Sequence, residues 1–349
     1  MRLPQPTTKN LDDAGTSSLQ KLLTAGNQSN RFFVEIKLED ACITGASSPW
    51  KIYWNRRERA FQPPPDEVQT MSDIPSITLT PAAAPVDFTA IKAKQQAAWA
   101  TGDYAVVGSA LVLMAELLCE AADLRSGWRV LDVASGSGNS SLAAARRGCR
   151  VTSTDYVPAL LERGRLRAEA EGFRIDFQEA DAENLPFDED EFDAVLSTVG
   201  VMFAPNQPRA ASELLRVCRP GGRVALANWT PSGFVGQVFR CISKYIPPAA
   251  GLKPPTLWGT EARLRELFGS QIKMNITPRH FIFRSHSPEK WLETFKTYFG
   301  PINKTFAALN EEGQGSLTSD LLALAYSLNR AGDGTMVVPS EYLEIVITK

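Results

Sequence analysis

The sequence is poor in the residues that bind metals and form disulfide bonds. It has two histidines and five cysteines in 349 residues, and none of the cysteines stand in a Cys-x-x-Cys pair. Zinc sites need several such ligands at short spacings, and disulfide frameworks need many cysteines in a short chain. We therefore expect no metal site and no disulfide framework, only reduced thiols in a cytosolic protein.

An excess of charge of one sign is also missing. The 37 Lys and Arg residues nearly balance the 39 Asp and Glu residues, and the formal net charge is −2. A chain of this kind carries no basic field for nucleic acid or for an anionic membrane. We expect a small-molecule substrate and no nucleic-acid partner, and the oligomeric state is left open.

Long hydrophobic runs are absent as well. A membrane helix needs about 20 apolar residues, whereas the longest candidate run, residues 110–119, contains Glu116. This run predicts a buried helix and not a membrane span. The N-terminus lacks the charged-then-apolar order of a signal peptide, so a cytoplasmic location is expected.

The first 70 residues differ in composition from the rest of the chain. Polar and turn residues dominate, and three consecutive prolines stand at positions 63–65. Such a segment buries little apolar surface. We predict a poorly ordered N-terminal extension over residues 1–70 and a folded domain over residues 85–349.

Strand-like and helix-like patterns alternate in the middle of the chain. This alternation is typical of an α/β fold with a doubly wound, mostly parallel sheet that is covered by helices on both faces. Helices are predicted from residue 87 and at 109–122, 138–147, 157–171 and 207–218, and strands at 128–133, 151–154, 175–178, 192–197 and 223–229.

The alternation stops after Trp229. Residues 230–290 are rich in proline, glycine and aromatic residues, with short helices expected at 233–245 and 260–268. An insertion of this kind beside an α/β sheet usually forms a cap or substrate wall. A last helix is predicted at 317–329 and a last strand at 342–347.

The most informative motif is the segment from Val130 to Asn139, where an apolar strand ends in Asp132 and a glycine-rich turn leads into a helix. Dinucleotide-binding loops have the pattern G-x-G-x-x-G, in which the backbone approaches a pyrophosphate. Here Gly136 and Gly138 are followed by Ser141 in place of the third glycine. The carboxylate of Asp132 also repels a pyrophosphate and suits a cationic amino-acid end. The motif therefore favours S-adenosylmethionine as the cofactor.

Two further acidic residues follow strands and support this interpretation. Asp155 ends the second predicted strand, where a carboxylate can accept both hydroxyl protons of a ribose. Asp181 follows the third predicted strand and can bind the exocyclic amine of adenine. Tyr156 or Leu185 is expected to cover the apolar faces of the adenine ring.

These blocks resemble the motifs of class I S-adenosylmethionine-dependent methyltransferases, in order and in spacing. The similar branch is the small-molecule group called type 11, which includes ubiquinone and menaquinone biosynthesis methyltransferases. The resemblance covers about residues 127–229, and it implies a Rossmann-like, mostly parallel seven-stranded sheet with this segment as the cofactor-binding core. The matched blocks are residues 132–138, Asp155, 181–187, 192–195 and 214–222.

The resemblance also implies roles for individual residues. It implies that the turn after the first strand shapes the methionine pocket, that Asp155 holds the ribose, and that Ser197 lies near the reactive sulfonium. One departure is Ala134, where the family usually has glycine. The implied cofactor-binding residues are Tyr104, Asp132, Ala134, Gly136, Gly138, Asp155, Tyr156, Asp181, Ala182 and Ser197.

Other residues with chemical potential have simpler interpretations. His280 and His286 lie on one face of an alternating aromatic segment, which favours a structural role over that of a general base. Arg279 and Arg284 could bind an acidic group but are expected not to, and the acidic run at residues 188–191 predicts a solvated turn. Candidates for an apolar substrate pocket are Trp229, Phe234, Phe239, Tyr245, Trp258 and Trp291.

The sequence therefore predicts a methyltransferase that acts on a small organic acceptor, of quinone-like, phenolic or secondary-metabolite type, through an oxygen, nitrogen or carbon nucleophile. In-line methyl transfer depends mainly on alignment, and no catalytic residue is identified. Two alternatives stay open at this point. One is a cofactor-binding regulator without turnover, and the other is a nicotinamide-dependent oxidoreductase. Nucleic-acid methylation is disfavoured, because residues 197–200 lack an Asn/Asp-Pro-Pro-Tyr/Phe sequence.

Overall fold

The computed structural model describes residues 86–101 and 103–349. The extension predicted for residues 1–70 lies outside the described residues, and so does Cys42. The other four cysteines, Cys119, Cys149, Cys218 and Cys241, are free and buried.

One seven-stranded sheet organises the described chain, with the strand order β3-β2-β1-β4-β5-β7-β6. The five strands β1 to β5 run parallel to one another, and β7 is antiparallel to both β5 and β6. The predicted doubly wound, mostly parallel sheet is therefore confirmed. The strands are β1 (Arg129–Val133), β2 (Arg150–Asp155), β3 (Ile175–Glu179), β4 (Phe192–Thr198), β5 (Cys218–Trp229), β6 (Lys273–Ser285) and β7 (Met336–Thr348).

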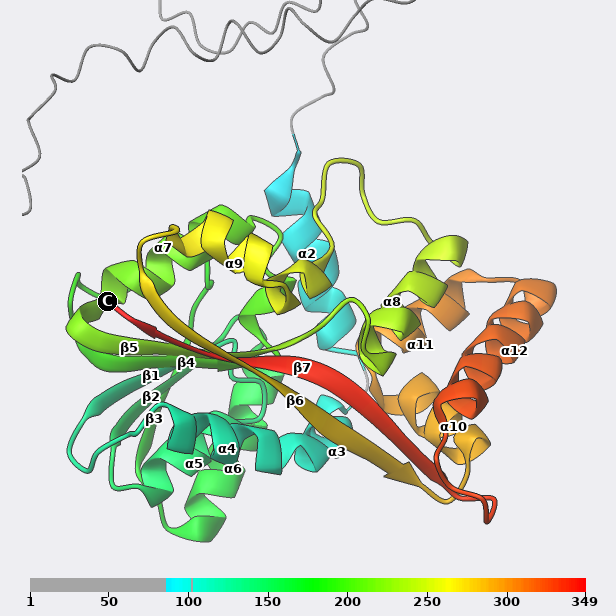
Figure 1. The fold of residues 1–349 in the computed structure, drawn as a ribbon, viewed down its shortest axis with the longest axis horizontal. Coiled ribbons are helices and arrows are strands. Elements are labelled where there is room, and N and C mark those ends of the chain that lie inside the picture. The colour runs from blue at the N-terminus through cyan, green and yellow to red at the C-terminus, as the bar shows by residue number, and fades with distance from the viewer. Residues whose placement is uncertain (1–85, 102) are drawn as a thin grey trace, which may run out of the picture. The chain divides into compact units, whose positions relative to one another are not determined.

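Helices cover both faces of this sheet. In Figure 1, α4, α5 and α6 lie on one side of it and α7 and α9 on the other, while β6 and β7 extend towards α8, α10, α11 and α12. The helices are α2 (Phe88–Trp99), α3 (Tyr104–Gly108), α4 (Val112–Ala121), α5 (Asn139–Arg146), α6 (Pro158–Glu171), α7 (Gln207–Val217), α8 (Phe234–Tyr245), α9 (Glu261–Phe268), α10 (Pro288–Tyr298), α11 (Gly300–Ala308) and α12 (Glu311–Leu328).

The order of the central strands explains why a ligand site is expected at the carboxyl ends of the strands. The sheet order changes direction between β1 and its neighbours β2 and β4. In open α/β sheets, ligands bind in the crevice outside the carboxyl ends of the strands at such a point. The turn after β1 and the residues that follow β2 and β4 therefore meet at one place.

The cap differs in extent from the predicted segment 230–290. Residues 273–285 form β6, an edge strand of the sheet, and pair along their whole length with β7. The helices at the end of the β6–β7 pair are α8, before β6, and α10 to α12, after it. The sequence placed this whole segment in the cap, although the alternation noted around His280 to His286 belongs to this strand. One face of an edge strand carries polar residues, which makes its pattern weak.

One helical run, Tyr104–Ala121, is long and apolar enough to cross a membrane by length and composition, alone among the described residues. Met114, Leu118 and Cys119 within it are nevertheless buried, and α4 packs against α5 and β5. The run therefore forms part of the core, as predicted for residues 110–119.

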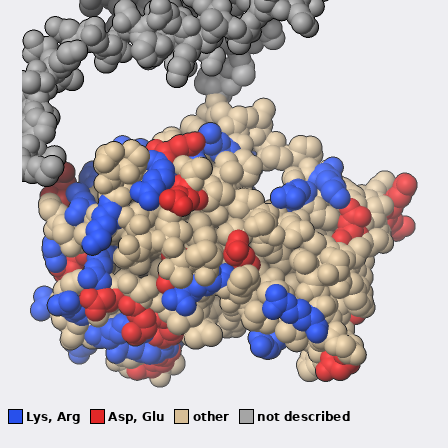
Figure 2. Space-filling view, in the orientation of Figure 1, with Lys and Arg blue, Asp and Glu red and all other residues tan. Residues whose placement is uncertain are grey.

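The charged side chains are mixed in sign on the face shown in Figure 2. Lys and Arg lie beside Asp and Glu over the sheet half of the domain, and uncharged residues cover most of the centre. This face carries no expanse of basic residues of the kind that binds a nucleic-acid backbone.

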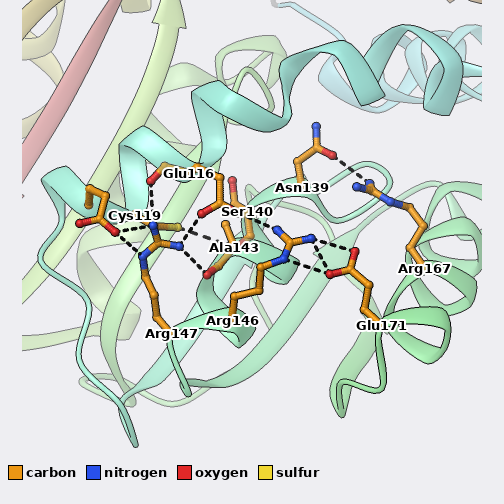
Figure 3. A network of polar contacts seen from close by, with 10 residues as sticks. Glu116, Cys119, Asn139, Ser140, Ala143, Arg146, Arg147, Arg167 and Glu171 are labelled. Atoms are coloured by element: carbon orange, nitrogen blue, oxygen red, sulfur yellow. Dashed lines mark hydrogen bonds and ion pairs between the residues drawn. The ribbon is translucent and has the colours of Figure 1, made fainter.

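An ion-pair network joins three helices on one face of the sheet (Figure 3). Arg147, at the end of α5, binds the carboxylate of Glu116 at 2.6 Å and the backbone oxygen of Ala143 at 2.8 Å. Arg146 binds Glu116 on α4 and Glu171 on α6, at 2.6 and 2.5 Å. Burial raises the pKa of Glu116, but hydrogen bonds from both arginines lower it further, below its usual value. The network thus fixes α5, the helix that follows the glycine-rich turn.

We expect Arg147→Ala to lower the free energy of unfolding by about 2 kcal/mol, because it removes the charge-assisted hydrogen bonds from the end of α5 to Glu116 and Glu120 of α4. Urea unfolding of the full chain measures this loss. The control is Lys290→Ala, which deletes the exposed pair with Glu293 and should cost less than about 0.5 kcal/mol. Equal losses in the two variants would contradict the role given to the network.

Candidate functional site

The turn between β1 and α5 depends on residues in the left-handed backbone region. Ala134, Gly136 and Gly138 have φ values of +52°, +56° and +80°. Glycine adopts this conformation freely, whereas an alanine there costs about 1 kcal/mol. The sequence departure at Ala134 therefore adds backbone strain to the turn.

Gly200, just after β4, lets the chain approach this turn closely. A Cβ atom at Gly200 would lie 2.2 Å from the backbone oxygen of Ala134 and 2.9 Å from its Cβ. Only glycine fits such a contact. The carboxyl ends of β1 and β4 are thus held together at the turn.

Asp155 ties the turn to the next strand. Its Oδ2 accepts a hydrogen bond from the backbone N–H of Gly136, and its Oδ1 accepts one from Val157, both at 2.9 Å. Burial raises the pKa of Asp155 to about 6, although these backbone donors oppose the shift. Each carboxylate oxygen keeps a lone pair for a further donor.

Asp132 is the most unusual polar group of the site. It is 1% exposed. Its Oδ2 accepts a hydrogen bond from the Ser141 hydroxyl at 2.6 Å, and Ser141 lies 2.8 Å from the Ser153 hydroxyl. Its Oδ1 is buried with no hydrogen-bond partner in the described chain. Burial raises the pKa of Asp132 to about 7, against the effect of Ser141. The hydroxyl of Ser141, at the position of the third glycine, thus supports Asp132.

Helix α2 contributes polar side chains from far away in the sequence. Lys92 Nζ lies 2.6 Å from Asp181 Oδ2 and 3.0 Å from Glu183 Oε2. Gln96 donates to the backbone oxygen of Tyr156, and Gln95 donates to that of Phe203 at 3.2 Å. These contacts place α2 beside the residues that follow β2, β3 and β4.

The turn is also supported from α6 and α3. Arg167 donates to the backbone oxygen of Ser137 at 2.7 Å and to Oδ1 of Asn139 at 2.8 Å. Asn139 in turn donates to the backbone oxygen of Gly108 at 2.8 Å, and Figure 3 shows the Arg167–Asn139 contact. The first residue of α5 is therefore fixed on both sides.

A cavity lies at this edge of the sheet, and most of the predicted site residues line it. Its wall includes the turn after β1, the residues after β2, β3 and β4, and the inner side of α2. The predicted residues in the wall are Tyr104, Asp132, Ala134, Gly136, Asp155, Tyr156, Asp181 and Ala182.

Two predicted site residues, Gly138 and Ser197, do not line the cavity. Gly138 is the N-cap of α5. The Ser197 hydroxyl donates to the backbone oxygen of Val133 at 2.7 Å and accepts from the backbone N–H of Val201 at 2.9 Å. Ser197 is thus a buried bridge between β4 and β1, and its place near the reactive sulfonium stays a prediction.

Several residues in the cavity wall were not predicted from the sequence. Three of them come from α2, a segment for which the sequence predicted only a helix: Lys92, Gln95 and Trp99. Their role depends on a contact between segments about 90 residues apart, which periodicity cannot report. Asn139, Val199, Gly200 and Phe203 also line the wall.

A second cavity adjoins the first one. Tyr104, Leu111, Val199 and Phe203 line both. The second cavity is completed by side chains of α8, β6 and α10. Of the predicted pocket aromatics, Trp229, Phe234, Phe239 and Trp291 line it, and Tyr245 and Trp258 do not.

The remaining candidates lie away from both cavities. His280 and His286 are exposed and line neither cavity. Arg279 forms an ion pair with Glu344 at 2.7 Å. No group of three His, Cys, Asp or Glu residues that could hold a metal ion occurs within residues 86–101 and 103–349.

Comparison with known proteins supplies a family. The family model described as a methyltransferase domain matches residues 131–226. An uncharacterised protein of Mycobacterium tuberculosis H37Rv is 39% identical over 263 residues, which cover 74% of this chain and 95% of that protein. The demethylmenaquinone methyltransferase of Clavibacter sepedonicus is 37% identical over 126 residues, or 36% of this chain and 51% of that enzyme. Among solved structures, the YcgJ protein of Bacillus subtilis aligns with a TM-score of 0.49 and 18% identity, covering 67% of this chain and 97% of that one.

The buried carboxyl group of Asp132 predicts a pH-dependent stability. Its pKa rises from 3.8 to about 7 on folding, so the folded state holds this proton more tightly than the unfolded chain does. Stability is therefore lost as the pH rises through the window between these values. We expect Asp132→Asn to be more stable than the wild type without ligand, by a margin that grows about 2 kcal/mol from pH 5 to pH 8.

Urea unfolding of the ligand-free chain at the two pH values measures this margin. Asp176→Asn, at an exposed position of β3, is the matched control, because it makes the same substitution away from the buried site. A margin for Asp132→Asn that is the same at pH 5 and pH 8 would contradict the raised pKa.

Proposed function

Because this chain belongs to the class I S-adenosylmethionine-dependent methyltransferases, we propose that it transfers the methyl group of S-adenosylmethionine to a small organic acceptor. The second product is S-adenosylhomocysteine. A small acceptor is supported by the aromatic cavity beside the cofactor cavity. It is also supported by the net charge of −2 and by the mixed surface charges in Figure 2, which do not favour nucleic acid.

The observation that carries this proposal is the unpartnered oxygen of Asp132. A buried carboxylate oxygen without a donor is costly, and Asp132 Oδ1 lies in a residue of the cavity wall. The ammonium group of the cofactor is a cation of the required kind. The residues present therefore fit S-adenosylmethionine better than a ligand with an anionic group at this point.

The other polar residues suit the nucleoside end of the cofactor. Asp155 keeps one lone pair on each carboxylate oxygen after accepting from Gly136 and Val157, as the two hydroxyl groups of a ribose require. Asp181 lines the same cavity, with Lys92 beside it, and would bind the adenine amine. Tyr156 would cover the ring.

The bound cofactor supplies an electrophilic methyl group. The chain supplies alignment, because three side chains of α2 line the cavity and one of them, Trp99, packs edge-on against Tyr104 and Phe203. Burial raises the pKa of Tyr104 to about 12, and Asp155 adds to the shift. The Tyr104 hydroxyl therefore keeps its proton at neutral pH and acts as a donor, not as a base.

We expect Asp155→Ala to weaken binding of S-adenosylhomocysteine about 10- to 100-fold, since two charge-assisted hydrogen bonds are lost. Calorimetry on the full chain measures the change. Asp176→Ala, exposed on β3, should bind like the wild type. The wild type should also prefer adenosine to 2′,3′-dideoxyadenosine, and Asp155→Ala should lose this preference. A variant that keeps the preference would rule out the ribose contact.

Turnover is tested by incubating the full chain with methyl-labelled S-adenosylmethionine and a fractionated small-molecule extract. We expect the label to appear in a product that is heavier than its precursor by one methyl group, in step with S-adenosylhomocysteine. The control is Gly200→Trp. A side chain at this position collides with the backbone of Ala134 at the cavity wall, and the variant should therefore lose transfer. Tight cofactor binding without label transfer to any fraction would contradict the proposal and favour a regulator.

A further inference from the structure

The aromatic cavity beside the cofactor cavity has an unusually uniform wall. Fourteen residues line it, of which nine are aromatic and five are valine or leucine. None is Asp, Glu, Lys, Arg or His. A charged group placed here would lose its hydration without gaining an ionic partner. The wall therefore selects against charged ligands.

The polar side-chain groups of this wall can each donate a hydrogen bond, and the Tyr104 hydroxyl can also accept one. They are the Tyr104 hydroxyl and the indole N–H groups of Trp229 and Trp291. Trp291, on α10, is 4% exposed, and its Nε1 is buried without a hydrogen-bond partner in the described chain. Trp291 lines the cavity, and a ligand that carries an accepting oxygen is the kind that would satisfy its unpaired donor.

Trp258 gives a useful contrast. Its Nε1 is also buried without a partner, but Trp258 packs against Phe268 and lines neither cavity. An unpartnered indole alone is therefore not a site. What distinguishes Trp291 is its place in the wall of a cavity that adjoins the cofactor cavity.

The junction of the two cavities carries backbone strain. Val199 lines both and has a φ of +55°, a conformation that is a clear outlier for a β-branched residue. Its backbone N–H donates to the oxygen of Ala227 at 2.8 Å, which holds it in place. Strain of this kind is retained where the wall must have a particular shape.

We propose that the methyl acceptor is an uncharged, largely apolar ring compound, and that Trp291 Nε1 fixes its orientation by donating a hydrogen bond to an oxygen of the ring system. This inference rests on the proposed methyltransferase function and specifies its acceptor. Trp291 is on this view a specificity residue that touches the acceptor. Ring faces pack against the aromatic wall, and the reacting atom lies towards Tyr104 and Val199.

The methyl transfer needs no basic side chain in this wall. A bond forms between the acceptor atom and the methyl carbon. The carbon–sulfur bond breaks, and its electron pair stays on sulfur, which becomes a neutral thioether. The acceptor's own proton is released to solvent. An acceptor with an acidic hydroxyl group or an activated ring carbon meets this requirement.

The test uses four probes of one size with the full chain saturated with S-adenosylhomocysteine. Naphthalene is apolar, 1-naphthol adds an oxygen, 1-naphthoate adds a negative charge and 1-naphthylmethylammonium adds a positive charge. Equilibrium dialysis gives each affinity. We expect 1-naphthol to bind at least about 10-fold more tightly than either charged probe.

The variant Trp291→Phe removes the N–H group and keeps an aromatic ring. It should weaken 1-naphthol about 5-fold, the usual worth of one hydrogen bond, and should change naphthalene less than about 2-fold. The matched control is Trp258→Phe, which should leave both affinities unchanged. Equal losses for 1-naphthol and naphthalene in Trp291→Phe, or a charged probe that binds as tightly as 1-naphthol, would overturn the proposal.

Binding of S-adenosylhomocysteine separates a failure of the proposed methyl transfer from a failure of the acceptor class. A wild-type chain that does not bind S-adenosylhomocysteine contradicts the proposed function itself. A chain that binds S-adenosylhomocysteine but none of the aromatic probes contradicts only the acceptor class. Binding of S-adenosylhomocysteine by Trp291→Phe at wild-type affinity shows that the variant is folded, so that its probe affinities can be compared directly.

Discussion

The site depends on one constraint, the pair of hydrogen bonds that Asp155 accepts from Gly136 and Val157. These bonds fix the turn after β1 against the residues that follow β2. They act together with the left-handed residues of the turn and with the close approach of Gly200 to Ala134. The carboxyl ends of three neighbouring strands are thereby held as one rigid edge, on which the cavity is built.

The two cavities divide the chemistry between them. The first has acidic side chains, and one of them, Asp132, is left with an unpartnered oxygen. The second has no charged residue in its wall. A polar, cationic cofactor and an apolar acceptor would each find a matching surface, and the shared wall brings their reacting atoms together. Alignment in a dry space is the main contribution that a methyltransferase makes to its rate.

The sequence predicted the parts of this arrangement that lie within one strand–turn–helix unit. Asp132, Gly136 and Asp155 lie at or just after the ends of strands with a clear pattern. Ser141 stands where a dinucleotide-binding loop has its third glycine, and its hydroxyl donates to Asp132. Lys92 was not predicted as a site residue, because its place depends on how distant segments pack. Trp291 was predicted only as one of six candidate pocket aromatics, and nothing in the sequence distinguished it from Trp258. The bridging contacts of the Ser197 hydroxyl were not predicted either, since a strand pattern does not report whether a hydroxyl group faces a cavity or the backbone of the next strand.

The shared wall of Tyr104, Leu111, Val199 and Phe203 has a consequence for how such a chain can diversify. A change in these residues alters both cavities, whereas a change in α8 or α10 alters only the aromatic one. The substrate range of related chains can thus drift through the helices carried on the β6–β7 pair, while the strand edge and its turn are preserved. The architecture separates what must be inherited unchanged from what is free to vary.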